Sequence, residues 1–361
     1  MAEKIYKNIL VDAMMHLGDL IHATSVIPLL KELYPGCKVS FLVEPGLVGL
    51  FENIDGVEHV IPYSYKSKGD YLAVFKMGKE LKKYNFDLSI SLDPRTRLAA
   101  MMWIANIPTR VGSRSIFWNE SGIERFFFTD YVEWGSYICK EHPAAENFQK
   151  LIKLFAGADD DEFYKPKFAV PQKSNIDYIK CKLNELPKAD LKIAFCVKTV
   201  DEARNWAPER FAELMNKIIE KYKADIIITG VKSDDDTANK IIASIKDKNR
   251  VLNLCGKTNL TQLNALFSKM DFLINFDNGM GHFAAAAGCP TITLFSNALP
   301  TQFTPLHDKT LIVQSGLKCV INCNKKLRKT CGLKCLEEVT VDKVMEKVDI
   351  LIKIYKNRFI L

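Results

Sequence analysis

The chain has 361 residues, of which 48% are hydrophobic and 26% charged, and its formal net charge is +7. This composition fits a soluble globular protein of two domains, because a single hydrophobic core rarely extends beyond about 250 to 300 residues. No uninterrupted apolar run reaches the roughly 18 residues of a membrane-spanning helix, which excludes an integral membrane protein of that type. Asp12, His16 and Asp19 interrupt the region where a signal peptide would be apolar, so we expect a cytoplasmic protein with mostly reduced cysteines.

Short β-branched runs alternate with amphipathic helical patterns through the first half of the chain. The strands expected there are residues 5–11, 39–43, 59–61, 88–92 and 110–112. Strands that are separated by helices imply βαβ units and a parallel sheet. The proline-containing stretch 139–187 suits an interdomain connection. We therefore predict a first Rossmann-like domain over residues 1–174.

The same alternation restarts in the second half and predicts a second Rossmann-like domain over residues 175–340. Its expected strands are 191–197, 225–230, 250–254, 272–276, 291–295 and 310–313. Residues 341–361 carry apolar side chains at helical spacing, and we expect this helix to pack back on the first domain. The fold class is thus α/β, with two doubly wound domains facing a central cleft that holds the ligand.

The most informative segment is 272–295, in which a buried strand runs through Asp277, Gly279 and Gly281 into an alanine-rich helix. Backbone N–H groups at a helix N-terminus are unpaired and carry the positive end of the helix dipole, so they bind phosphate. Gly279 and Gly281 would let an anion approach the backbone closely. The alternative is a tight strand-to-helix connection without a ligand.

The same segment matches the dinucleotide pattern G-x-G-x-x-A loosely, which raises the possibility of a nicotinamide-dependent oxidoreductase. That pattern requires an acidic residue at the end of the next strand to hold a ribose. The next strand ends with Phe295, Ser296 and Asn297, and the acidic residue is absent.

A second strand, glycine turn and helix occupy the N-terminus, where Gly18 and Asp19 begin the predicted helix. A carboxylate at this position is most often a helix cap, and the functional alternative is a catalytic base. His16 and His22 are rival candidates for that base.

These segments together resemble glycosyltransferase family 9, the heptosyltransferases that build the inner core of lipopolysaccharide. The resemblance extends over nearly the whole chain. It rests on Gly18-Asp19 with a helix ending at Tyr34-Pro35, on 204–211, on Gly230 with Asp234, on 254–258, and on 277–290 with Pro300 and Pro305.

The resemblance implies a GT-B fold and inverting, metal-independent transfer from a nucleotide sugar, usually ADP-heptose, with no cofactor. Carried over by motif, the catalytic residues are Asp19 as base and Arg204 beside the donor phosphates. The donor-binding residues are Lys198, Thr199, Asp234, Asp277, Gly279, Met280, Gly281 and His282. In such a reaction Asp19 takes the acceptor proton, and Arg204 with the helix N-terminus stabilises the leaving diphosphate.

Two departures from the family pattern affect the predicted donor site. The family usually has Lys directly before Trp-Pro, whereas here Arg204 precedes Asn205, Trp206 and an inserted Ala207. The common Asp-Ser-Gly or Asp-Thr-Gly is Asp277-Asn278-Gly279. The positive charge is kept, although the geometry of an arginine differs from that of a lysine.

Other residues suggest the acceptor, the membrane and a metal. Four arginines follow predicted strands of the first domain and could bind an acidic acceptor, namely Arg95, Arg97, Arg110 and Arg114; ordinary surface arginines are the alternative. Residues 316–361 hold eleven lysines and arginines against five acidic residues, which suits an anionic partner, either a membrane or nucleic acid, or is simply a solvated lysine-rich surface. We expect peripheral contact with the anionic inner membrane and no nucleic acid. Cys319, Cys323, Cys331 and Cys335 form a possible zinc site, or else are simple loop thiols.

The sequence therefore predicts a heptosyltransferase with a phosphorylated glycolipid acceptor. The alternatives are a transferase of the same fold that uses another nucleotide sugar, a nicotinamide-dependent oxidoreductase, and a binding protein that has lost catalysis.

Overall fold

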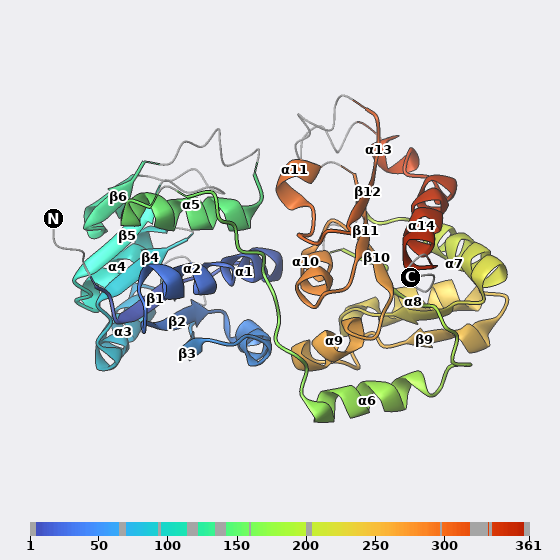
Figure 1. The fold of residues 1–361 in the computed structure, drawn as a ribbon, viewed down its shortest axis with the longest axis horizontal. Coiled ribbons are helices and arrows are strands. Elements are labelled where there is room, and N and C mark those ends of the chain that lie inside the picture. Colours follow the sequence, from blue (N-terminus) through green and yellow to red (C-terminus); the bar gives the residue numbers. More distant parts are fainter. Residues whose placement is uncertain are drawn as a thin grey trace. The chain divides into compact units, whose positions relative to one another are not determined.

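The computed structural model describes residues 5–64, 70–92, 95–113, 122–133, 142–158, 160–199, 204–296, 298–317, 331 and 334–356. The chain forms two compact units, Met1–Lys167 and Phe168–Leu361 (Figure 1). The division thus falls a few residues before the expected boundary at 174/175. Each unit contains one parallel six-stranded sheet, as the alternation of strand and helix patterns predicts.

The sheet of the first unit has the strand order β3-β2-β1-β4-β5-β6. Its strands are β1 (Asn8–Asp12), β2 (Lys38–Val43), β3 (Val57–Pro62), β4 (Leu88–Ser91), β5 (Thr109–Ser113) and β6 (Asp130–Val132). The sequence analysis missed β6, because its three residues are half-buried and form no apolar run. The order reverses direction between β1 and β4, so their carboxyl ends form the topological switch point.

The reversal places the helices of the first unit in two groups. Contacts join α1 (Leu17–Ala23) and α2 (Val26–Leu33) to α5 (Ala144–Ala156), and join α3 (Tyr71–Leu81) to α4 (Thr96–Ile104). Right-handed crossovers in opposite directions put such groups on opposite faces of a sheet. Two 3₁₀ segments, η1 (Pro45–Asn53) and η3 (Ile123–Phe127), follow β2 and precede β6.

The sheet of the second unit has the strand order β12-β11-β10-β7-β8-β9, with its switch point between β7 and β10. Its strands are β7 (Lys192–Cys196), β8 (Asp225–Ile228), β9 (Val251–Asn253), β10 (Phe272–Phe276), β11 (Thr291–Phe295) and β12 (Leu311–Gln314). The helices are α6 (Lys173–Leu183), α7 (Pro208–Tyr222), α8 (Asp235–Ala243), α9 (Leu260–Phe267), α10 (Gly279–Ala286), α11 (Pro300–Phe303), α13 (Lys334–Glu337) and α14 (Val341–Lys356).

The described residues of the C-terminal helix α14, which we expected to pack back on the first domain, pack within the second unit. Val344, Val348 and Leu351 are fully buried in the same hydrophobic core as Phe211 of α7. Lys221 of α7 also forms an ion pair with Asp349 of α14, with an Nζ–Oδ2 distance of 2.8 Å. The apolar stripe was read correctly, but periodicity alone does not identify the surface that covers it.

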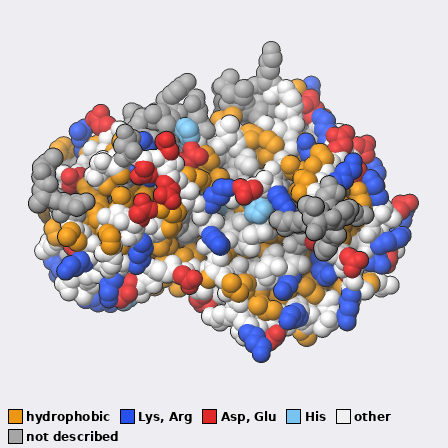
Figure 2. Space-filling model, viewed as in Figure 1, with side chains coloured by type: hydrophobic (Ala, Val, Ile, Leu, Met, Phe, Trp, Pro, Cys, Tyr) orange, Lys and Arg blue, Asp and Glu red, His pale blue; other side chains and the backbone are white. Residues whose placement is uncertain are grey.

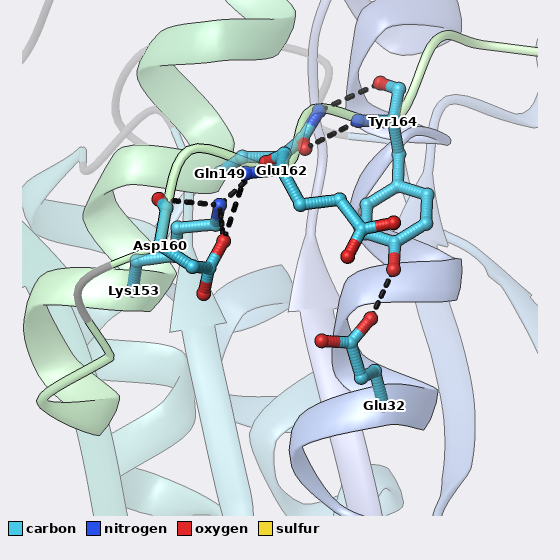
Figure 3. A network of polar contacts seen from close by, with 6 residues as sticks. All are labelled: Glu32, Gln149, Lys153, Asp160, Glu162 and Tyr164. Atoms are coloured by element: carbon cyan, nitrogen blue, oxygen red, sulfur yellow. Dashed lines mark hydrogen bonds and ion pairs between the residues drawn. The ribbon is translucent and has the colours of Figure 1, made fainter.

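The segment that leads out of the first unit is held by side chains of α5 (Figure 3). The buried Lys153 amine donates to the carbonyl oxygen of Asp160 at 3.1 Å, to that of Glu162 at 2.5 Å, and to the Asp160 carboxylate. The Gln149 amide pairs with the backbone N–H and carbonyl of Tyr164 at 2.9 and 2.8 Å. The Tyr164 hydroxyl donates to Glu32 of α2.

Among the described helices, none is both long enough and apolar enough to cross a membrane.

Candidate functional site

The best-defined group of polar residues lies at the switch point of the second sheet. Strands β7 and β10 are paired in parallel, with Cys196 opposite Asn275, so the loops that follow them leave the same edge. The loop after β7 contains Lys198, Thr199 and Arg204, and the turn after β10 contains Asp277. In an open α/β sheet this edge is where a ligand binds.

Arg204 and Asp277 contact each other across this edge. The Arg204 guanidinium donates through Nη2 to the Asp277 backbone carbonyl at 2.7 Å, and its Nη1 lies 3.4 Å from the Asp277 carboxylate. The side chains are 24% and 14% exposed, so neither is fully screened by water. A half-buried guanidinium at a helix N-terminus is well suited to bind phosphate oxygens.

Burial raises the pKa of the Asp277 carboxyl to about 6, and the nearby Arg204 charge partly opposes this shift. The Asp277 carboxyl, which is paired with the Arg204 guanidinium, therefore gains or loses its proton at a pH close to neutral. A ligand that brings negative charge to Arg204 would compete directly with the Asp277 carboxylate.

Helix α10 begins at this site, with Asn278 as its N-cap. The side-chain amide oxygen of Asn278 accepts the Met280 N–H at 3.1 Å, which satisfies one donor of the first turn. The aligned peptide dipoles still place positive charge at this end of the helix. Gly279 and Met280 are half-buried at the same end, where an anion would bind.

Two asparagine side chains hold the loop after β7 from both sides. Asn205 accepts the Thr199 N–H at 2.7 Å and donates to the Thr199 carbonyl at 3.3 Å. Asn278 donates to the Lys198 carbonyl at 3.4 Å and to Cys196 Sγ at 3.4 Å. The two positions at which the sequence departs from the family pattern thus fix the backbone that carries Lys198 and Thr199.

Gly281 and His282 lie inside α10 and are buried. A Cβ atom at Gly281 would lie 2.5 Å from Asn275 Nδ2 and 3.0 Å from Pro305 Cγ, so close packing requires glycine there. Burial lowers the pKa of His282 to about 4, which keeps the imidazole neutral at pH 7. Both residues therefore shape the helix that supports the site.

The predicted donor-binding residue Asp234 follows β8 and is buried in its own turn. Its carboxylate accepts the Val231 N–H at 3.0 Å and packs against Gly230, where an added Cβ would lie 2.5 Å from Oδ2. The next acid, Asp235, accepts from Asn253 Nδ2 at 2.8 Å and pairs with Lys232 at 3.2 Å. A side chain of the turn after β8 and one of β9 therefore meet at Asp235.

In the first unit, the switch point brings together the ends of β1 and β4. The Ser91 hydroxyl donates to the buried Asp12 carboxylate at 2.9 Å. Asp19 lies in the first turn of α1, half-buried, where its negative charge is favoured by the helix dipole. Its position at the carboxyl edge of the sheet is compatible with a base.

Among the predicted acceptor arginines, the structure separates Arg110 from Arg95 and Arg97. Arg95 is the N-cap of α4 and Arg97 lies in its first turn, directly after β4. Arg110 instead lies near the amino end of β5, and its guanidinium donates to the carbonyls of Ile107 and Phe127 at 2.5 and 2.6 Å. It is not brought together with Arg95 and supports the backbone locally. Arg114 lies outside the described residues.

Of the four cysteines suggested as a zinc site, Cys319 and Cys323 also lie outside the described residues. Cys331 and Cys335 are described, and Cys335 is a buried residue of α13. No cluster of three or more potential metal ligands occurs within the described part of the chain.

Sequence reasoning did not identify Asn205, Asn278, Asp12 or Ser91 as site residues. Asn205 and Asn278 stood out in the sequence only as departures from a motif. The contacts of their amide groups with the loop after β7 are apparent only in the folded chain. Asp12 and Ser91 end two strands that are far apart in sequence but paired in the sheet. The sequence feature that could have identified Asp12 and Ser91 is that each of them ends a strand.

The family model for glycosyltransferase family 9 (heptosyltransferase) matches residues 74–336. Lipopolysaccharide core heptosyltransferase OpsX of Haemophilus influenzae is 25% identical over 304 residues, which cover 82% of this chain and 81% of that protein. Lipooligosaccharide heptosyltransferase 2 of the same organism is 24% identical over 359 residues, which cover 96% and 99%.

Solved structures share the whole fold. A family 9 glycosyl transferase from Veillonella parvula has a TM-score of 0.82 at 19% identity and covers 97% of this chain and 98% of its own. The ADP-heptose lps heptosyltransferase II of Escherichia coli has a TM-score of 0.78 at 20% identity and covers 97% and 99%. These likenesses establish the two-unit GT-B architecture that the sequence predicts.

Proposed function

Because the chain belongs to glycosyltransferase family 9, we propose that it transfers a heptose from ADP-heptose to a hydroxyl of a phosphorylated lipopolysaccharide inner-core acceptor. Membership in this family makes it a glycosyltransferase, so the nicotinamide-dependent alternative no longer applies. The names of its relatives support the choice of heptose and of the lipopolysaccharide acceptor. The name of a structural neighbour supports ADP-heptose as donor.

The observation that carries the proposal is the meeting of Arg204, Asp277 and the start of α10 at the switch point of the second sheet. Positive charge from the guanidinium and the helix dipole converges there without a requirement for a metal ion. A diphosphate that leaves with increasing negative charge would be stabilised by this arrangement. Lys198 and Thr199 lie on the adjoining loop and would contact the same group.

In the proposed step, the acceptor oxygen forms a bond to the anomeric carbon while the bond from that carbon to the diphosphate oxygen breaks. Asp19 of the first unit accepts the acceptor proton, and the nucleoside diphosphate departs with the bonding electrons. Attack from the face opposite the leaving group inverts the anomeric centre. The acceptor phosphates would meet Arg95 and Arg97, which follow β4.

The proposed acceptor also defines where the protein acts. A lipid-linked sugar is presented at the cytoplasmic face of the inner membrane, so we place the enzyme there as a peripheral protein. The proposed site binds the phosphates of the donor, so another nucleotide sugar would use the same site.

Asp19→Asn tests the catalytic assignment. We expect kcat for transfer from ADP-heptose to fall by at least about a hundredfold, which is typical for loss of a general base, with unchanged affinity for ADP. Glu52→Gln, which changes an exposed acid of the same unit, is the matched control and should keep full activity. Full activity of Asp19→Asn would remove Asp19 from the role of base.

A further inference from the structure

A group of large apolar side chains is exposed on one face of the first unit. Phe126 is 86% exposed and Tyr71 is 74% exposed, values that are unusual for aromatic residues of a folded domain. The full set, which we call the α3–η3 surface, is Tyr71, Leu72 and Phe75 of α3, Trp103 of α4, and Ile123 and Phe126 of η3.

The elements that carry these side chains are packed together. Helix α3 contacts α4, and α4 contacts η3. At the crossing of α3 and α4, a Cβ atom at Gly78 would lie 2.8 Å from Ile104 Cβ, so the two helices are in close contact. The Trp103 and Phe127 ring centroids are 6.1 Å apart, which joins α4 to η3. The exposed apolar residues therefore lie on elements that are packed against one another.

Basic residues surround the aromatic ones on this face. Lys76, Lys79, Lys82 and Lys83 are all exposed on or directly after α3. The Lys79 ammonium lies 4.4 Å from the Phe75 ring centroid. The only carboxylate between residues 71 and 84 is Glu80, which pairs with Lys83. Where Figure 1 places α3, Figure 2 shows hydrophobic and basic side chains next to one another.

We propose that the α3–η3 surface docks onto a membrane with anionic headgroups. Lysine is depleted from protein–protein interfaces, whereas lysine interleaved with exposed aromatic residues is typical of a helix that lies in a bilayer interface. Aromatic rings are favoured at the depth of the headgroups, and long lysine side chains reach the phosphates above them. The net positive charge of α3 complements an acidic leaflet.

This inference rests on the proposed function only for the identity of the membrane. It also places the membrane contact on a surface of the first unit, whereas the sequence suggested the basic C-terminal stretch. Acceptor-free vesicles therefore test it independently of sugar transfer.

The experiment measures flotation of the full-length protein with vesicles of phosphatidylglycerol and phosphatidylcholine, and with vesicles of phosphatidylcholine alone. The wild type should bind the anionic vesicles and bind the neutral ones far more weakly. Phe75→Ser combined with Lys79→Gln should abolish most binding. Replacing only exposed charges, Lys76→Gln with Lys82→Gln, should weaken binding roughly twenty-fivefold, since each lysine near an acidic surface contributes about fivefold.

The matched control is Lys343→Gln with Ile350→Ser, which changes an exposed lysine and an exposed apolar residue of α14. It should bind as the wild type does. The proposal is overturned if the wild type binds no vesicles, if the α3 variants bind as well as the wild type, or if the α14 variant alone loses binding. A dimer that the α3 variants dissolve would also overturn it, in favour of a second copy of the chain.

Transfer to a water-soluble, deacylated acceptor separates this inference from the proposed function. The α3 variants should keep that activity, because their changes are remote in sequence from Asp19, Arg204 and Asp277. Vesicle binding without any transfer would contradict the proposed function and leave the docking surface intact.

Discussion

At the residue scale, the carboxyl of Asp277 is the group whose titration the structure predicts most clearly. Burial raises its pKa from 3.8 to about 6, and Arg204 opposes the rise. Since the folded pKa exceeds the unfolded one, the folded state binds more protons between these values. Asp277 therefore lowers the free energy of unfolding as the pH rises from about 3.8 to about 6.

Arg204→Gln should raise the pKa of Asp277 further, by roughly one pH unit, because the opposing positive charge is removed. NMR titration of the side-chain carboxyl carbon measures this value directly. Arg210→Gln, which alters a neighbouring arginine that donates to the Leu336 carbonyl, is the control and should leave it unchanged. A lower pKa in Arg204→Gln would contradict the assigned electrostatics.

Asn205 provides a second test at this scale. Asn205→Ala removes both hydrogen bonds that hold the Thr199 backbone, and we expect kcat/KM for the donor to fall roughly tenfold. Asn216→Ala is a matched control, because Asn216, in the middle of α7, holds the backbone of Ser244 and Lys246 in the same way. An equal loss in both variants would show that Asn205 has only a structural role.

At the element scale, α5 fixes the segment that leads from the first unit toward the second. Lys153 satisfies two carbonyls and one carboxylate there while it is nearly fully buried. Its loss leaves those acceptors without their charged donor, and we expect Lys153→Met to lower the free energy of unfolding by roughly 2 to 4 kcal/mol. Tryptic cleavage after Lys167, which is exposed and followed by Phe168, should accelerate at the same time.

Lys150→Met, one turn earlier on α5 and half-buried, is the control for this change and should resist trypsin as the wild type does. If Lys153→Met unfolds and is cleaved at wild-type rates, α5 does not hold the connection.

At the scale of the whole molecule, sequence patterns were sufficient for most of the architecture. Eleven of the twelve strands in the described part of the chain follow from apolar runs between helical patterns, since parallel strands are buried on both faces. The pattern could not place α14, because an apolar stripe does not specify its partner. It could not find β6 either, because that strand pairs along one edge of the sheet with little burial.

The candidate site could be predicted from the sequence only where a motif identifies its residues. Arg204 and Asp277 were singled out separately, and the sheet order brings them within hydrogen-bonding distance. The roles of Gly281 and Arg110 could not be read from spacing, because each depends on contacts with residues remote in sequence, Pro305 for one and Phe127 for the other. Long-range packing therefore determines the contacts that each of these residues makes.

The most direct test of the central claim is a thermal titration of the protein with ADP, ADP-heptose, UDP and GDP, without added metal. A ligand that binds only the native state stabilises it by about 2.7 kcal/mol at a hundred times its Kd. We predict that ADP and ADP-heptose raise the melting temperature and that Arg204→Gln loses most of this response. Stabilisation by UDP or GDP alone, or an undiminished response in Arg204→Gln, would contradict the account.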